Sequence, residues 1–166
     1  MQTKAFVLVA IAGLAHARFG QEGAVQNLVQ ALSNFGPPGA AGTLAGRTPG
    51  VLLAGANACA KLELADEIVA TLGDNPRVIE AAKALVAAEK NFNPFVQNIP
   101  TICNNPALPT TQALRGIVPK VDPAVVGADI QNANSQRSLT NPFNDNGLSV
   151  ADISRAQGFS NFTDQV

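Results

Sequence analysis

The sequence predicts a small, mainly α-helical domain with long Pro- and Gly-rich connections and one disulfide. Apolar residues recur at helical spacing in several segments, which is typical of helices with one buried face. The 11 prolines and 14 glycines gather between those segments, where they favour turns and loops. The chain contains two cysteines, Cys59 and Cys103, enough for one bridge. Residues 18–166 are long enough for a single domain with a sizeable core.

Three helices are expected in the first half of the chain. Apolar residues at i, i+3, i+4 and i+7 over 25–32 predict a helix of about three turns that ends at Gly36. A second helix is expected over about 57–72, with Gly73 as a left-handed cap. A third begins at Asn75, because Asn before Pro is a favourable helix start. The short link predicts that the second and third helices pack antiparallel.

The connections are predicted from their glycines and prolines. Residues 35–55 are expected to form a loop with at most one short turn. Six prolines between Pro94 and Pro123 exclude a long helix or a central strand there. Residues 116–121 and 124–130 contain β-branched side chains and are therefore candidates for a short β element.

A fourth helix is expected near the C-terminus. Ser149 is a candidate N-cap, and Asp152 three residues later completes a variant of the capping box. Gly158 is expected to end this helix.

The first 17 residues have the pattern of a signal peptide. Lys4 supplies a positive charge, 5–15 is an apolar run too short to span a bilayer, and 15–17 (Ala-His-Ala) resembles a cleavage site. We therefore expect a secreted, extracellular domain over 18–166. That product would contain no His, because the single histidine is His16. Without an imidazole, Ser-His-Asp and Cys-His catalysis are excluded, and we expect the protein not to be an enzyme.

Charge and hydropathy exclude two classes of partner. The net charge is −1, charged residues make up 14% of the chain, and no basic cluster occurs. Nucleic acid binding needs phosphate-neutralising Lys and Arg, so no nucleic acid partner is expected. No later apolar stretch approaches about 20 residues, so we expect no membrane partner after removal of the signal peptide.

Two modifications are expected on the secretory route. Cys59 and Cys103 are most simply a disulfide; the alternative is a free nucleophilic thiol, although no His is present to form its thiolate. Asn161 begins the sequon Asn-Phe-Thr and is a candidate N-glycosylation site, which would make the product a glycoprotein. The alternative for this region is an unmodified, frayed tail.

The sequence gives little support to catalysis by a Ser-Lys dyad or by paired carboxylates. Lys61, Lys83 and Lys90 would each suit a Ser-Lys dyad but are interpreted as solvated charges. Paired carboxylates suit glycoside hydrolysis, but sugar clefts usually need Trp or Tyr, and the chain has neither. The carboxylates on predicted helices are therefore interpreted as solvated surface: Glu63, Asp66, Glu67, Glu80 and Glu89.

No metal and no cofactor are expected. Residues 144–147 (Asn-Asp-Asn-Gly) resemble part of a calcium loop, but Pro142 and Ile153 stand where acidic ligands are required, which favours a tight turn. The glycines at 39, 42 and 46 lack the Lys-Ser or Lys-Thr ending of a phosphate loop.

Three stretches resemble small secreted proteins of filamentous ascomycete fungi: 17–21 (ARFGQ), 53–62 (LAGANACAKL) and 147–152 (GLSVAD). Such proteins of plant pathogens are often candidate effectors, and one of similar broad type inhibits a papain-like cysteine protease of its host. The resemblance implies a virulence effector that contacts an extracellular host protein. The Gln-x-Val-x-Gly wedge of cystatins is absent, so inhibition would use another surface.

The leading hypothesis is a secreted, non-enzymatic interaction protein that inserts a rigid loop into the cleft of a host protein such as a papain-like cysteine protease. Two segments are candidates for that loop, 98–109 and 35–50, since Pro reduces the entropy lost on binding. A structural or wall-associated protein and a carrier of an apolar small molecule are the alternatives. The expected contact residues are Asn98, Ile99, Pro100, Thr101, Ile102, Asn104 and Asn105.

Overall fold

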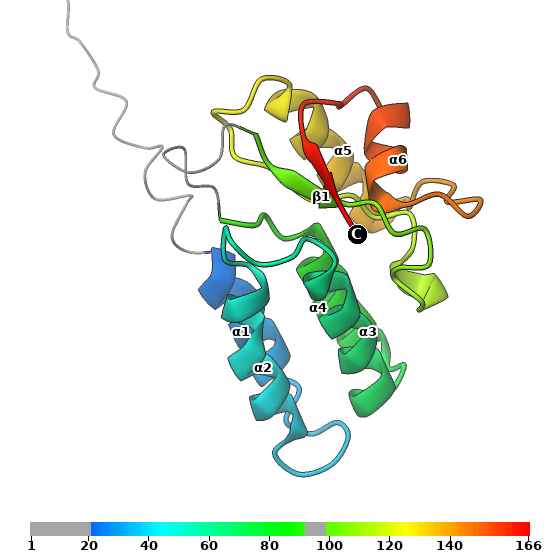
Figure 1. Cartoon of the computed structure of the whole chain (residues 1–166). Helices are drawn as coiled ribbons and strands as arrows, with labels where there is room; N and C mark the ends of the chain where they lie inside the picture. The colour runs from blue at the N-terminus through cyan, green and yellow to red at the C-terminus, as the bar shows by residue number, and fades with distance from the viewer. Residues whose placement is uncertain (1–20, 92–98) are drawn as a thin grey trace, which may run out of the picture.

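The computed structural model describes residues 21–91 and 99–166. The expected signal peptide over 1–17 and the expected contact residue Asn98 lie outside the described residues. The described part is mainly helical, with six α-helices and one short sheet of two strands, which confirms the predicted fold class (Figure 1). Cys59 and Cys103 form the predicted disulfide, with their Cα atoms 4.8 Å apart.

Four helices form a short bundle. Each of them packs against two others, in the cycle α1–α2–α3–α4–α1. Figure 1 shows two helical hairpins side by side, α1 with α2 and α3 with α4. Leu62, Ile68 and Leu85 are fully buried at the centre, so the bundle encloses an apolar core. The four helices are α1 (Gln21–Gln30), α2 (Ala40–Val51), α3 (Ala60–Leu72) and α4 (Pro76–Ala87).

The helix starts and ends follow local chemistry. α1 ends at Gln30, earlier than the expected end at Gly36, and turns connect the two positions. α4 begins as predicted, because the Asn75 side chain accepts a hydrogen bond from the Arg77 amide at 3.1 Å. Gly73 is the C-cap of α3 and has a positive φ of 93°, but its ψ of 178° lies outside the predicted left-handed helical conformation.

The expectation of a loop over 35–55 is wrong, because α2 occupies Ala40–Val51. Its buried residues recur at helical spacing, but they include two alanines and a threonine. Together with the glycines of this segment, they make the apolar pattern too weak to recognise in the sequence. Pro49 lies in the last turn of α2 and supplies no amide for the hydrogen bond to the carbonyl four residues earlier. The candidate binding loop over 35–50 is therefore largely a packed helix.

The C-terminal half covers one end of the bundle. It contains β1 (Thr101–Cys103), the 3-10 helix η1 (Gln112–Leu114), α5 (Ala128–Thr140), α6 (Val150–Ala156) and β2 (Thr163–Gln165). β1 and β2 are parallel, with Ile102 opposite Asp164. α6 begins with the predicted capping box of Ser149 and Asp152.

The two segments considered for short strands form none. Residues 124–130 run into α5, whose buried side chains are mostly polar, so the helix has no apolar stripe. Residues 116–121 lie alongside α5, and side chains of the helix take the place of a strand partner. Asn132 Oδ1 accepts a hydrogen bond from the Val121 amide at 2.8 Å, and Gln131 Nε2 donates to Pro119 O at 2.7 Å.

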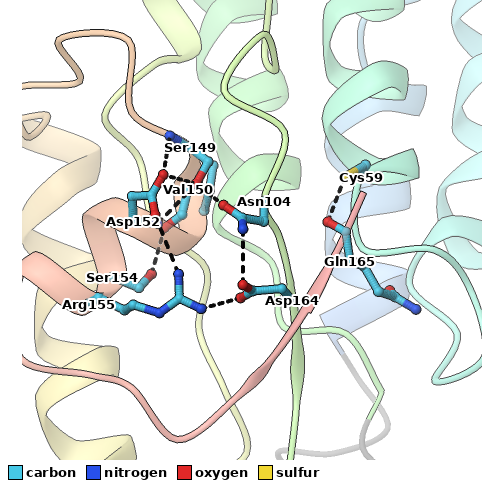
Figure 2. Close-up of polar contacts among 9 residues, drawn as sticks. All are labelled: Cys59, Asn104, Ser149, Val150, Asp152, Ser154, Arg155, Asp164 and Gln165. Carbon is cyan, nitrogen blue, oxygen red and sulfur yellow. Dashed lines mark hydrogen bonds and ion pairs between the residues drawn. The ribbon is translucent and has the colours of Figure 1, made fainter.

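The disulfide lies where α3, β1 and β2 meet. The predicted bridge joins the residue before α3 to the last residue of β1, a strand that the sequence did not predict. On the same side, Gln165 O accepts a hydrogen bond from the Asn104 amide at 2.7 Å, and its side chain accepts one from the Ala58 amide at 2.8 Å. Gln165 O also lies 3.5 Å from the Cys59 sulfur (Figure 2). We call this meeting point the disulfide junction.

Polar side chains connect α6 to the disulfide junction, as Figure 2 shows. Asn104 Nδ2 donates a hydrogen bond to Asp164 at 3.0 Å, and Ser149 Oγ lies 2.6 Å from Asn104 Oδ1. Arg155 forms ion pairs with Asp164 in β2 and with Asp152 in its own helix. Together these contacts hold the ends of β1, β2 and α6 in one arrangement.

Gly116→Ala should destabilise the fold strongly. Gly116 has a φ of 76°, and an added Cβ would overlap the carbonyl oxygen of Phe143. Gly39→Ala is the matched control, since Gly39 has a φ of 81° but no atom within 4 Å of an added Cβ. Urea denaturation should show a loss of about 3 kcal/mol or more for Gly116→Ala against about 1–2 kcal/mol for Gly39→Ala. Equal losses would contradict the packing of Gly116 against Phe143.

Candidate functional site

The expected contact residues do not form one projecting loop. Thr101 and Ile102 belong to β1, and Ile102 is only 2% exposed. The Asn104 side chain is held between α6 and β2. Ile102 is thus a core residue and Asn104 a structural one, so their assignment as partner contacts does not match their positions. Ile99 and Pro100 are half-buried and lead into β1.

The exposed loop in this part of the chain begins at the last predicted contact residue, Asn105. The Asn105 side chain accepts a hydrogen bond from the Ala107 amide at 3.0 Å, and its carbonyl accepts one from Leu108 at 3.1 Å. Pro106, Ala107 and Thr110 are exposed, whereas Pro109 is buried. Residues 105–111, called here the 105–111 loop, therefore present a small uncharged tip.

Asp66 of α3 holds the C-terminal end of the 105–111 loop. One carboxylate oxygen accepts the Thr110 amide at 2.7 Å, and the other accepts the Thr111 amide at 2.8 Å. Hydrogen bonds to a charged acceptor are stronger than those between neutral groups. The interpretation of Asp66 as solvated helix surface is therefore wrong.

Arg115 supports the 105–111 loop from behind. Its guanidinium donates to Pro109 O at 2.9 Å and to Pro106 O at 3.0 Å. It also pairs with Asp145, and both side chains are largely buried, at 12% and 22% exposure. The hydrogen bond from Arg115 lowers the pKa of Asp145, so the pair stays charged at neutral pH. Two loop carbonyls thus point inward to one fixed side chain.

Lys61 is the largest departure from the expectation of solvated lysines. It is 4% exposed, and its ammonium nitrogen donates to Ala88 O at 2.6 Å. Ala88 is the C-cap of α4, so Lys61 satisfies a terminal carbonyl at the negative end of the helix dipole. The sequence contains a signal for this burial, because residue 61 falls on the same helical stripe as Ala65, Ile68 and Leu72.

Lys90 approaches the same region from the chain that follows α4. Its nitrogen donates to Ala56 O and to Thr101 Oγ1, the latter at 3.0 Å. Both lysines line a pocket of about 20 Å³, which has room for about one water molecule. We call it the lysine pocket. Its other lining residues are Pro100, Thr101, Ile102, Pro119, Lys120, Val121 and Asp122.

Burial lowers the pKa values of both amines. Desolvation, together with the nearby charge of Lys90, lowers the pKa of Lys61 to about 7, and Glu89 acts in the opposite direction. Desolvation also lowers the pKa of Lys90 to about 8. At pH 7 about half of Lys61 and about a tenth of Lys90 is therefore the neutral amine.

Asn161 is half-buried beside the exposed Val126, and its side-chain nitrogen donates to Val126 O at 3.2 Å. The sequon threonine, Thr163, is exposed and begins β2, so the alternative of a frayed tail is wrong. Phe162 packs on Phe159 with ring centroids 5.6 Å apart. Glycosylation at Asn161 stays a prediction.

Burial of Lys61 predicts a stability that rises with pH. Between about pH 7 and 10.5 the unfolded chain binds a proton at this position and the folded chain does not. The cost of burying the charge is therefore fully present below about pH 7 and is relieved above it, by up to about 1.4 kcal/mol per pH unit. Urea denaturation from pH 7 to 9.5 should show this slope, to which Lys90 adds above about pH 8, and Lys61→Met should lower the slope without removing the part due to Lys90.

Lys83→Met, on α4, is the matched control and should keep the slope of the unmodified protein. If Lys61→Met keeps the same slope as Lys83→Met, the buried amine is not its source.

Neither metal ligands nor known relatives indicate the function. Within 21–91 and 99–166, no group of three or more His, Cys, Asp or Glu side chains could hold a metal ion. No helix in those same ranges has the length and apolar character needed to span a membrane. No protein-family model, curated protein or solved structure matches the chain.

Proposed function

We propose that this chain is a secreted, non-enzymatic interaction protein that inserts the 105–111 loop into the cleft of an extracellular host protein. The observation that carries the proposal is the double support of this loop. Asp66 accepts two of its amides, and Arg115 donates to two of its carbonyls, while Pro106 and Ala107 at the tip remain exposed.

A loop that is ordered before binding loses little conformational entropy on binding. Here the disulfide holds the chain just before the loop, at Cys103, and Asp66 holds its far end. The supporting hydrogen bonds come from the protein side, so they remain intact when a partner covers the tip. The tip carries no charge, which suits a narrow cleft that must be desolvated.

Papain-like cysteine proteases are the first target class to test, and the resemblance to fungal effectors supports this choice. The disulfide fits an oxidising extracellular environment, and the signal-peptide pattern over 1–17 supports secretion. In this proposal the protein acts as a virulence effector by blocking the protease cleft, without chemistry of its own.

Ala107→Arg should weaken binding through the loop without unfolding the protein, because residue 107 is exposed. The full chain is expressed through a secretory host, the product is recovered oxidised, and inhibition of purified papain and of apoplastic cysteine proteases is titrated. We expect stoichiometric inhibition by the unmodified protein and at least about a tenfold weaker effect for Ala107→Arg, equivalent to about 1.4 kcal/mol.

Ala133→Arg is the matched control, since Ala133 is also exposed but lies on α5. It should inhibit like the unmodified protein. Asp66→Ala should also weaken inhibition, because it releases the Thr110 and Thr111 amides, whereas Glu63→Ala on the same helix should not. Absence of inhibition, equal inhibition by both arginine variants, or capture of wall polysaccharide alone would contradict the proposal.

A further inference from the structure

We infer that the lysine pocket is a carbonyl-reactive site, in which the amine of Lys90 condenses with a small aldehyde to form a Schiff base. This inference concerns a different part of the molecule from the 105–111 loop and does not depend on the proposed function.

Four segments build the site. Lys61 comes from α3, Lys90 follows α4, Thr101 begins β1, and Lys120 and Asp122 lie on the chain before α5. Lys90 is half-buried and Lys61 is only 4% exposed, so Lys90 is the more accessible of the two amines. Lys90 is therefore the nucleophile, and Lys61 is a fixed neighbour held by Ala88 O.

The surroundings of Lys90 favour a neutral, nucleophilic amine. Burial disfavours the ammonium form of Lys90. Lys61 and Lys120 are the other amines that line the pocket, and Glu89 and Asp122 are the carboxylates of this region. Desolvation is the cause that lowers the pKa of Lys90 to about 8.

Thr101 is placed to assist the addition step. Its hydroxyl oxygen lies 3.0 Å from the Lys90 nitrogen, within reach of an oxygen that develops on an attacked carbonyl. The pocket has room for about one water molecule, so it admits the carbonyl group of a small aldehyde while the remainder of the molecule stays outside.

The reaction balances without an oxidant or reductant. The lone pair of the Lys90 nitrogen forms a bond to the carbonyl carbon, and the carbonyl electron pair moves to oxygen. Transfer of a proton from nitrogen to that oxygen gives a carbinolamine. The oxygen takes a second proton and leaves as water while the nitrogen lone pair forms the C=N bond, and the resulting iminium loses its proton to give the neutral imine.

The test uses acetaldehyde as the probe and cyanoborohydride as the reductant that traps the imine as a secondary amine. The secreted, oxidised protein is treated at about pH 7.5, and the rate of modification at each lysine is followed by peptide mass spectrometry. We expect Lys90 to react at least about tenfold faster than Lys83, which serves as the internal reference, because more of it is neutral. The rate at Lys90 should level off above about pH 8.

Thr101→Val tests whether the Thr101 hydroxyl assists the addition step or whether the neutral form of Lys90 alone explains its reactivity. It removes the hydroxyl with little change in shape and should slow modification at Lys90 several-fold while leaving Lys83 unchanged. A circular dichroism melt confirms that the variant is folded. Reaction at Lys90 no faster than at Lys83 would overturn the inference, as would preferential reaction at Lys61 or Lys120. An unchanged rate at Lys90 in folded Thr101→Val would overturn the role of Thr101.

Discussion

The disulfide between Cys59 and Cys103 is the constraint on which the remaining structure depends. It closes a sequence separation of 44 residues, for which the loop-entropy model gives a stabilisation of about 4 kcal/mol. The bridge fixes the position of β1 against the start of α3. β2 then pairs with β1, and Asn104 connects both strands to α6 (Figure 2). Away from the junction, α5 and η1 pack on α4, and Asp66 of α3 bonds the chain at Thr110 and Thr111, so these contacts and the junction together position the C-terminal half.

Both functional proposals follow from the course of the chain through β1. Thr101, at its start, lies against the Lys90 amine in the lysine pocket, and Cys103, at its end, forms the disulfide. Asn105 then begins the 105–111 loop, which Arg115 and Asp66 hold from the protein side. A short strand thus places a candidate reactive site on one side of the disulfide junction and a candidate binding loop on the other.

The sequence predicts those elements whose signals are local. Apolar stripes and caps identify α3, α4 and the start of α6, and two cysteines on a secretory route predict the bridge. The sequence does not predict α2, because glycines interrupt its short row of buried side chains. It does not predict α5, because the buried side chains of this helix are mostly polar and form hydrogen bonds to residues 116–121. The roles of Asp66 and Arg115 depend on hydrogen bonds to the 105–111 loop. The helical periodicity of the sequence does not reveal such contacts.

The central claim is that the 105–111 loop is ordered before any partner binds. Backbone ¹⁵N relaxation of the oxidised protein tests it directly at the amides of Ala107, Leu108, Thr110 and Thr111. The double support by Asp66 and Arg115 predicts order parameters near about 0.85, equal to those of α3. Values below about 0.6 at these amides would show a flexible loop and contradict the account.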